Sequence, residues 1–520
     1  MSQPNPYDEL PYGSNAVFEM HPNRMAVVGR LFGLDPAPVR TCRVLDIGCA
    51  EGGNAIPVAV SLPQARVIGI DLSERQVAIG NGWISALGLG NVELVRADLS
   101  ELKGEHGTFD YVCAHGVCSW VAPEVREKLL AACRDLLSPD GVAYVSYNTH
   151  PGWSPRLVLR EMGLFRARRQ RGEARKVAAV RRLLARVSVP TARTGADPYR
   201  RLLALQWSLL EGKPDGYIAH DLLEEENHPC WFHEFVAKAA EAGLAYVADA
   251  RFGAPPASTV LPGVARELGE LGAGRLEREQ YADFLLDRGF RQSLLCRRER
   301  TPLEEPDLSA LDRFHVVSCV RPEEPLPDPA PGEPAKFVTG YGAHRTTDDP
   351  GLKAALALLW ERFPEPVPFP ELLGRVATAG REGAQGDPGG LREALLRAHA
   401  DDVVDLLEHV PAFAAKPGQR PVASPLVRLQ AAEAGLAVTS LLHREIVIEN
   451  GVVHLVLARL DGTRDVAALA REAAEAVVSG GLMTDEDGRT VTDLPRVLAA
   501  VEEAMGGILD GAAGSSLLAG

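Results

Sequence analysis

The 520-residue sequence lacks the segments that would place it in a membrane or direct it out of the cell. It has no run of about 18 apolar residues, which excludes a transmembrane helix of ordinary length. The opening residues, MSQPNPYDELPYGS, lack the basic and apolar stretches of a signal peptide. We therefore expect a cytoplasmic protein with no membrane span.

Motifs for disulfide, zinc and triphosphate chemistry are also missing. The eight cysteines contain no CxxC pair, so neither a disulfide framework nor a metal site is expected. No GxxxxGK[ST] loop is present to hold a triphosphate, and no internal repeat is found. The cysteines, which we expect to be buried thiols, are Cys42, Cys49, Cys113, Cys118, Cys133, Cys230, Cys296 and Cys319.

Positive charge is scarce, except in one segment. Lys and Arg number 55 against 70 Asp and Glu, a net charge of −15 that makes nucleic acid an unfavourable main partner. Residues 156–201 reverse this balance, with 14 basic and 3 acidic side chains, a local charge of +11. This segment could steer an acidic protein or peptide substrate, or bind a second subunit. A solvated helical face is the alternative, and nucleic acid stays open only through this segment.

What is present indicates a large globular protein of several domains, since 46% of residues are hydrophobic and 24% are charged. Short apolar runs alternate with amphipathic helical stretches between Cys42 and Asn148, a pattern typical of a parallel α/β sheet. Five strands are predicted there: CRVLDIG, RVIGID, VELVRAD, FDYVCAH and GVAYVSYN. The runs LAYVADARF and FRQSLLCRR add an antiparallel pair, which gives a seven-stranded sheet.

The remaining segments are predicted to surround and extend this sheet. Helices are expected over GLKAALALLWERF, PELLGRVA, LREALLRAHADDVVDLLEHV and DVAALAREAAEAVV, and a hairpin around Asn450-Gly451. This indicates a helix-rich C-terminal α+β domain, with winged-helix type as the candidate. The expected divisions are 1–40 (N-terminal segment), 41–150 (sheet, first part), 151–229 (inserted helices), 230–299 (end of the sheet, with an insertion at 253–288), 300–336 (proline-rich linker) and 337–520 (C-terminal domain).

A glycine turn and the ends of the next two strands carry the chemistry. The turn VLDIGCAEGGN, from Val44 to Asn54, follows the first strand and opens a helix, so its backbone can approach a ligand closely. Asp71 ends the second strand, where a carboxylate can accept both hydroxyls of a ribose. Asp98 ends the third, where it can accept from an adenine amine. Either acid alone is also an ordinary residue before a turn.

The turn also favours one kind of adenosine ligand. Asp46 would repel a pyrophosphate, whereas it would attract an ammonium or a sulfonium group. The predicted ligand is therefore an adenosine joined to a cationic amino-acid moiety, which is S-adenosyl-L-methionine, with S-adenosyl-L-homocysteine as the product. The residues expected to bind it are Asp46, Gly48, Ala50, Gly52, Gly53, Asn54, Asp71, Leu72, Asp98, Leu99, His115 and Gly116.

These motifs resemble the class I S-adenosylmethionine-dependent methyltransferases over residues 41–148. The resemblance implies a Rossmann-like methyltransferase sheet. Ala50 departs from the pattern, because it stands where the family usually has its second glycine. We expect its single methyl group to be tolerated where the loop faces the small methionine part of the cofactor, with the effect on affinity left open.

A narrower resemblance covers residues 1–299. It rests on the phrases YDELPYGSNAVFEMHPNRMA, HGVCSWV, SYNTHPGW, YIAHDLLEEENHPCWFHEF and EQYADFLLDRGFRQSLLC, which look like bacterial methyltransferases with a methyltransferase regulatory domain. This similarity implies protein-lysine methylation, since known members modify bacterial outer-membrane proteins. A small-molecule or natural-product methyltransferase is the alternative, and a cofactor-binding regulator without turnover is a second one.

The acceptor side must lie at the carboxyl edge of the sheet. We expect Tyr147, Asn148 and His115 to act in catalysis by orienting the acceptor amine, because methyl transfer mainly requires orientation. A strand cap for His115 and core packing for Trp120 are the alternatives. The residues expected to line the acceptor channel are Tyr12, Ser14, Trp120, Tyr147 and Trp153. In the resembling family the N-terminal segment covers the cofactor, and a homodimer through 151–229 is a further expectation.

Overall fold

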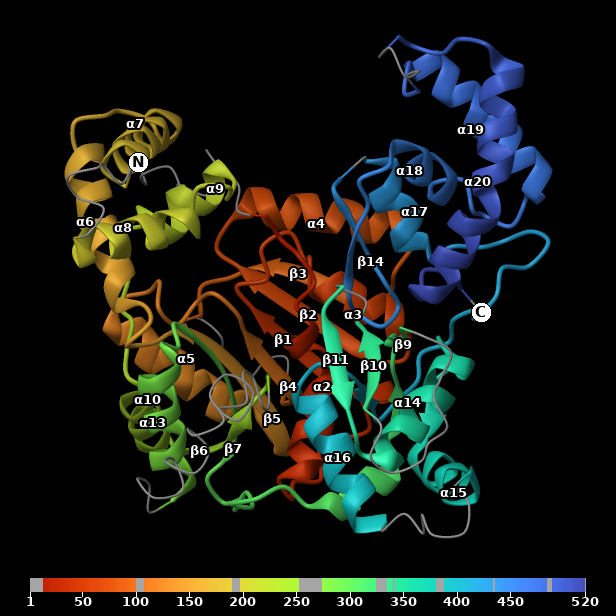
Figure 1. Cartoon of the computed structure of the whole chain (residues 1–520). Coiled ribbons are helices and arrows are strands. Elements are labelled where there is room, and N and C mark those ends of the chain that lie inside the picture. The colour runs from red at the N-terminus through yellow and green to blue at the C-terminus, as the bar shows by residue number, and fades with distance from the viewer. Residues whose placement is uncertain are drawn as a thin grey trace.

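The computed structural model describes residues 13–99, 107–188, 197–251, 274–323, 334–339, 342–379, 388–433, 435–483 and 489–519 (Figure 1). Its centre is a seven-stranded mixed sheet in the order β3-β2-β1-β4-β5-β7-β6. β7 runs antiparallel to both β5 and β6, while β1 to β5 run parallel to one another. The strands are β1 (Arg43–Ile47), β2 (Arg66–Asp71), β3 (Val92–Arg96), β4 (Phe109–Ala114), β5 (Leu137–Asn148), β6 (Leu244–Asp249) and β7 (Phe290–Arg297).

The predicted strands and the antiparallel pair are thus confirmed, with one correction at the start of β5. The residues SPD, which precede the predicted strand GVAYVSYN, belong to the strand itself. The register between β4 and β5 shifts between Phe109 and Tyr111, which absorbs the extra residues. The strand therefore begins directly after the helix that precedes it.

Helices cover both faces of the sheet, and each face has its own apolar core. One core contains residues of α2, α3 and α4, and the other contains residues of α5 and α10. α2 also packs against β5 and β6, so a segment from the N-terminus covers the β5-β7-β6 side of the sheet. The covering helices are α2 (Pro22–Leu31), α3 (Ala55–Ser61), α4 (Glu74–Leu87), α5 (Pro123–Leu136), α10 (Phe232–Glu241) and α13 (Arg275–Leu286).

The insertion after β5 is helical, as predicted, and forms a third core of its own. In Figure 1 it lies at the upper left, away from the C-terminal helices at the upper right. Its elements are α6 (Ser154–Ala167), α7 (Glu173–Val187), α8 (Pro198–Ser208), α9 (Asp215–Tyr217) and the π-helix η5 (Ile218–Leu222).

The expected linker at 300–336 is wrong for the part from Leu308 to Pro322. There η6 (Leu308–Arg313), β8 (His315–Val317) and β9 (Arg321–Pro322) form, because Leu311 and Phe314 are buried in the same core as α2. The proline-rich residues 324–333 lie outside the described part. The segment continues with β10 (Ala335–Val338), β11 (His344–Thr347), α14 (Pro350–Arg362), β12 (Val367–Pro368), α15 (Phe369–Ala379), α16 (Pro388–Ala400) and β13 (Asp405–Leu407).

Two further expectations fail in the C-terminal part. The helix predicted through 410 ends at Ala400, since Asp405–Leu407 pairs with β8 as strand β13. The hairpin expected around Asn450-Gly451 is a helix start, because the Asn450 side chain accepts a hydrogen bond from the amide of Val452 at 2.8 Å. The hairpin of this region lies earlier in the chain, where Ala437–Thr439 pairs antiparallel with Glu445–Val447. The elements are α17 (Pro425–Ala432), β14 (Ala437–Thr439), β15 (Glu445–Val447), α18 (Gly451–Leu457), α19 (Val466–Gly480) and α20 (Leu494–Gly514).

These last elements share a separate apolar core and are called the C-terminal unit, residues 421–519. In the described part of the chain, no helix has both the length and the apolar character needed to cross a membrane.

Candidate active site at the carboxyl edge of the sheet

The glycine turn is fixed by its backbone at the end of β1. The amides of Gly48 and Cys49 both donate to the carbonyl of Ile70, at 2.8 and 3.0 Å, which ties the turn to the end of β2. Gly48 has a φ of +76°, and a Cβ added there would lie 2.6 Å from the side chain of Val117. Glycine is therefore required at this position both by backbone conformation and by space.

Ala50 occupies a left-handed conformation, with a φ of 48°. A residue with a Cβ is strained in this conformation by about 1 to 2 kcal/mol. Alanine in place of glycine therefore strains the backbone in addition to filling space with its methyl group. Its amide donates to Oδ2 of Asp71 at 2.9 Å, which helps to hold this conformation. The turn is thus formed, but with local strain.

Asp46 is a buried carboxyl group at the end of β1, with 2% of its surface exposed. Its Oδ2 has no hydrogen-bond partner among the described residues. Burial raises its pKa from 3.8 to about 7; Asp71 nearby adds to this, and a hydrogen bond from the side chain of Asn54 opposes it. An oxygen that is buried and unsatisfied in this way fits a cationic ligand group such as an ammonium.

Asp71 and Asp98 follow strands that end at the same edge, since β2 and β3 pair in parallel with Asp71 opposite Arg96. Oδ1 of Asp71 accepts from the amide of Ser73 at 2.9 Å, and Oδ2 accepts from the turn, so this carboxylate is held in place. Leu72 beside it is 61% exposed, and Asp98 and Leu99 are half-buried after β3. The predicted ribose and adenine residues therefore stand in a row along one edge.

The described N-terminal segment crosses the turn at Gly53. The amide of Gly53 donates to Oγ of Ser14 at 2.8 Å, and a Cβ at Gly53 would lie 2.3 Å from the Ser14 backbone. Ser14, predicted on the acceptor side, thus contacts the cofactor turn instead. Tyr12 lies outside the described residues.

His115 after β4 belongs to a hydrogen-bonded group whose other members, Tyr144 and Gln292, were not predicted from the sequence. Nε2 of Gln292 donates to the hydroxyl of Tyr144 at 2.9 Å, and this hydroxyl lies 2.9 Å from Nδ1 of His115. Burial lowers the pKa of His115 to about 4 and raises that of Tyr144 well above 10. At neutral pH both are uncharged, and the Tyr144 hydroxyl, which accepts from Gln292, is free to donate a hydrogen bond to Nδ1 and so to hold the ring. Gly116 beside it is exposed, and its amide donates to Oγ of Ser146.

Tyr147 does not face this group, contrary to the prediction of an acceptor-facing catalytic residue. Successive side chains of a strand point to opposite faces, so Tyr144 and Tyr147, three residues apart, lie on different sides of β5. Tyr147 stacks on Phe235 of α10 at 3.9 Å between ring centres, and its hydroxyl lies 3.1 Å from Oγ of Ser293. It is a core residue, 1% exposed, and the alternation of β5 could have identified Tyr144 instead.

Asn148 is placed as predicted, at the end of β5 beside other unsatisfied polar groups. It is 3% exposed, and its Nδ2 has no partner among the described residues. The same holds for Nε1 of Trp153, and for both side-chain polar atoms of Asn227, which the sequence did not single out. Trp120 contacts Trp153 edge-on, with 6.0 Å between ring centres.

Hydrogen bonds join the segments around Ser119, Asn148 and Cys230. The amide of Asn148 donates to Oγ of Ser119 at 2.8 Å, and the amide of His228 donates to the carbonyl of Ser119 at 2.8 Å. The amide of Cys230 donates to the carbonyl of Asn148 at 3.2 Å. The unsatisfied groups thus lie on neighbouring segments at the carboxyl edge, where a polar acceptor group would find donors and acceptors. Within the described ranges, no three His, Cys, Asp or Glu side chains gather as a metal site.

Three family models match the chain in separate regions. They are "Methyltransferase domain" at 44–141, "Predicted methyltransferase regulatory domain" at 214–297 and "PKMT, C-terminal winged helix domain" at 419–517. The first covers the glycine turn and the strand ends described above. The last coincides with the C-terminal unit.

Relatives and solved structures extend the similarity over most of the chain. The uncharacterized protein RP789 of Rickettsia prowazekii is 33% identical over 379 residues, which are 72% of this chain and 68% of that protein. The uncharacterized protein RP028 of the same organism is 36% identical over 233 residues, 45% of this chain and 93% of that protein. The structure of PKMT2 from Rickettsia typhi in complex with AdoHcy matches with a TM-score of 0.85 and 27% identity, over 98% of this chain and 100% of that chain.

Proposed function

Since this chain belongs to the family of class I methyltransferases that join a methyltransferase domain to a regulatory domain and a PKMT winged-helix domain, we propose that it methylates lysine side chains of a protein. S-adenosylmethionine is the proposed methyl donor. The observation that carries the cofactor assignment is the buried, unsatisfied carboxyl of Asp46 at the glycine turn, next to the fixed carboxylate of Asp71.

In this proposal the turn and the strand ends hold the cofactor. Asp46 accepts a hydrogen bond from the cofactor's ammonium group, and Asp71 accepts from the ribose hydroxyls. Asp98 accepts from the adenine amine, and Leu72 and Leu99 lie beside the base. The cofactor supplies an activated methyl group on a sulfonium that leaves as a neutral thioether. The protein has then mainly to orient the acceptor and to exclude water.

The acceptor side is proposed to lie at Asn148, Trp153 and Asn227. Among their unsatisfied polar atoms, Oδ1 of Asn227 can accept a hydrogen bond from the amine, which leaves the nitrogen lone pair free to attack the methyl group. A lysine with an ordinary pKa of about 10.4 must reach the site as the neutral amine, and burial favours that form. Neutral His115 and protonated Tyr144 add no charge that would oppose or attract the ammonium form.

A protein substrate with an acidic surface is favoured by the inserted helices. Eight arginines of the basic segment are exposed, five of them on α6, α7 and α8 and three on the connection between α6 and α7. A face of this kind attracts acidic partners and accelerates their encounter. These arginines are Arg166, Arg168, Arg169, Arg171, Arg175, Arg182, Arg186 and Arg201.

A homodimer through the same insertion is proposed from the apolar face of α8. Tyr199, Leu202, Leu205 and Leu209 recur at helical spacing and are 52%, 37%, 57% and 51% exposed. A second copy that covers this face would bury it. Sedimentation analysis tests this, because Leu205→Glu should convert a dimer into a monomer.

The function is tested by labelled methyl transfer in lysate. The purified protein is incubated with methyl-labelled S-adenosylmethionine and a lysate, and the products are separated by mass. Incorporation into protein supports the proposal. Label confined to low-mass products would instead establish the small-molecule alternative, and absence of any label with intact cofactor binding would indicate a regulator without turnover.

A further inference from the structure

A histidine of the winged-helix domain reaches the cofactor turn. His443 lies in the tip between β14 and β15, and only 1% of it is exposed. Its Nε2 lies 2.8 Å from Oδ1 of Asn54, a residue 389 positions earlier in the chain. Its ring centre is 4.9 Å from that of His21 at the start of α2. The tip is therefore inserted into the methyltransferase domain beside the turn.

The surrounding contacts hold this tip in place. Nη2 of Arg444 bonds both carboxylate oxygens of Asp405, at 2.6 and 2.5 Å, and its guanidinium lies 4.1 Å from the ring centre of Phe18. The amide of Leu441 donates to the carbonyl of Ser516 at 3.0 Å, which ties the tip to its own domain. The position of His443 is thus fixed from both domains.

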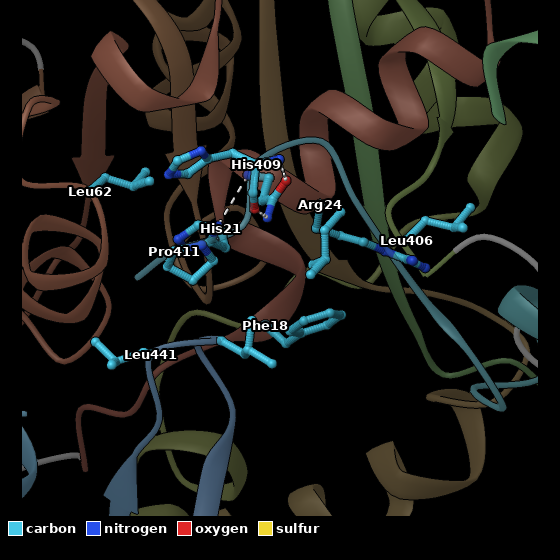
Figure 2. A pocket seen from close by; sticks show the side chains of 11 residues that line it. Phe18, His21, Arg24, Leu62, Leu406, His409, Pro411 and Leu441 are labelled. Atoms are coloured by element: carbon cyan, nitrogen blue, oxygen red, sulfur yellow. Dashed lines mark hydrogen bonds between the residues drawn. The ribbon is translucent and has the colours of Figure 1, made fainter. Parts of the chain in front are cut away.

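The junction beside the tip is also closely packed. Figure 2 shows His21, which caps α2, and Arg24 of α2 facing Leu406, His409 and Pro411, with Leu441 of the tip below them. The cavity among these side chains has a volume of about 10 Å³, enough for about one water molecule. There is little room for the tip to shift.

The hydrogen bonds of Asn54 have a defined direction. Its Oδ1 receives the amide of Val17 at 3.3 Å and faces Nε2 of His443, so Oδ1 is the acceptor end of the amide. Nδ2, which only donates, is then the end that bonds the carboxyl of Asp46. Burial lowers the pKa of His443 to about 3, so the ring is neutral. Its Nδ1 is buried with no partner among the described residues, and Nε2 therefore carries the proton.

We propose that His443 is a positioning residue for the cofactor: it holds the amide of Asn54 so that Nδ2 donates to Asp46, and the winged-helix domain thereby completes the cofactor site. This inference rests on the proposed placement of the cofactor at Asp46. It predicts that cofactor binding and the docking of the winged-helix tip stabilise one another, because both depend on the same amide.

The test compares three variants by calorimetry with S-adenosylhomocysteine as the probe. His443→Asn suits the left-handed backbone of this residue, which has a φ of 60°, but its shorter amide cannot reach Asn54. His443→Gln carries an amide NH₂ about where Nε2 lies. His454→Asn is the matched control, because His454 bonds the carbonyl of Ile448 within the winged-helix domain.

His443→Asn should weaken S-adenosylhomocysteine binding about 3- to 10-fold, the range expected for one hydrogen bond. His443→Gln should recover most of the affinity, and the control should bind as the wild type does. Equal loss in the Asn and Gln variants, or no loss in either, would overturn the inference. Asp46→Asn separates the two proposals, because unchanged affinity there would refute the cofactor placement itself, whereas a loss there with none in His443→Asn would refute only the role of His443.

Affinity measured over a pH series distinguishes a positioning role of His443 from a purely structural one. Loss of the donated hydrogen bond raises the pKa of Asp46, so the affinity defect of His443→Asn should be larger at pH 6.5 than at pH 8.5. The other titratable groups that face Asp46 are Asp71, Cys49 and Cys113, and burial raises the pKa of both thiols, which stay neutral. A defect of equal size at both pH values would indicate only a structural role.

Discussion

Replacement of Asp46 by Asn should stabilise the cofactor-free protein and weaken the cofactor complex. The pKa of this carboxyl is raised from 3.8 to about 7 because it is buried, which corresponds to about 4 kcal/mol at about 1.4 kcal/mol per tenfold change in ionisation. Ionised Asp46 above pH 7 therefore destabilises the folded protein by up to this amount. Asn keeps the shape and the hydrogen bond from Asn54 without the charge.

The sign of the pH dependence follows from where the proton is bound. Between about pH 4 and 7 the folded protein keeps a proton on Asp46 that the unfolded chain has released, so this group lowers stability as pH rises. We expect Asp46→Asn to match the wild type at pH 4 and to be more stable at pH 8, by up to about 4 kcal/mol. Denaturation of the cofactor-free protein at both pH values measures this difference.

Asp46→Asn should lower the affinity for S-adenosylhomocysteine, although it raises stability. Loss of the interaction between a carboxylate and an ammonium group should weaken S-adenosylhomocysteine about 10- to 100-fold at pH 8, as measured by calorimetry. Asp110→Asn is the control, because Asp110 accepts from the amide of Arg43 and from Ser138 outside the turn. It should lose stability and keep its affinity. Lower stability of Asp46→Asn at pH 8 would contradict the raised pKa of Asp46, and wild-type affinity would contradict its contact with the ammonium group.

Three further predictions concern the turn and β5. Ala50→Gly should stabilise the protein by up to about 1 kcal/mol, since relief of left-handed strain outweighs the added chain entropy; a clear fall in melting temperature would contradict this. Tyr144→Phe should lower kcat/KM about 5- to 10-fold. Tyr147→Phe should cost about 1 kcal/mol of stability and leave the kinetics unchanged. The reverse pattern in steady-state assays would place Tyr147, and not Tyr144, in the active site. Gly53→Ala should release the N-terminal segment to proteolysis and weaken S-adenosylhomocysteine, while Gly82→Ala, where a Cβ meets nothing within 4 Å, should do neither.

The cofactor side could be predicted because its signals are local. The glycine turn, the strand-end acids and the alternation of strands and helices lie within about 100 residues, and the sheet brings their ends to one edge. Asp46, Asp71 and Asp98 are placed accordingly. What the sequence could not show at Ala50 is the backbone conformation, which depends on the hydrogen bond to Asp71.

The acceptor side was predicted less well, for a reason that the sequence contains. Asn148 lies at the edge as expected, but Tyr147 points to the opposite face because side chains alternate along a strand. Applying this alternation outward from Asn148 selects Ser146 and Tyr144. Gln292, which completes the group with His115, comes from a strand 144 residues after Asn148 and gives no local signal.

The C-terminal errors arise from ambiguous local signals. Asn-Gly serves both as a hairpin turn and as a helix start, and at Asn450 the side chain caps a helix. The expected linker folds between Leu308 and Pro322 because Leu311 and Phe314 join a core formed by distant segments. The contact between His443 and Asn54 joins residues 389 positions apart, so no pattern in the sequence could reveal it.

Chemical identification of the methylated residue tests whether this methyltransferase modifies lysine in a protein. A protein labelled by the wild type and methyl-labelled S-adenosylmethionine is hydrolysed, and its amino acids are separated. We predict that the label is recovered as N-methylated lysine, and that Asn148→Ala reduces it while S-adenosylhomocysteine binding is retained. Label recovered in another amino acid, or only in small molecules, would show that lysine in a protein is not the acceptor.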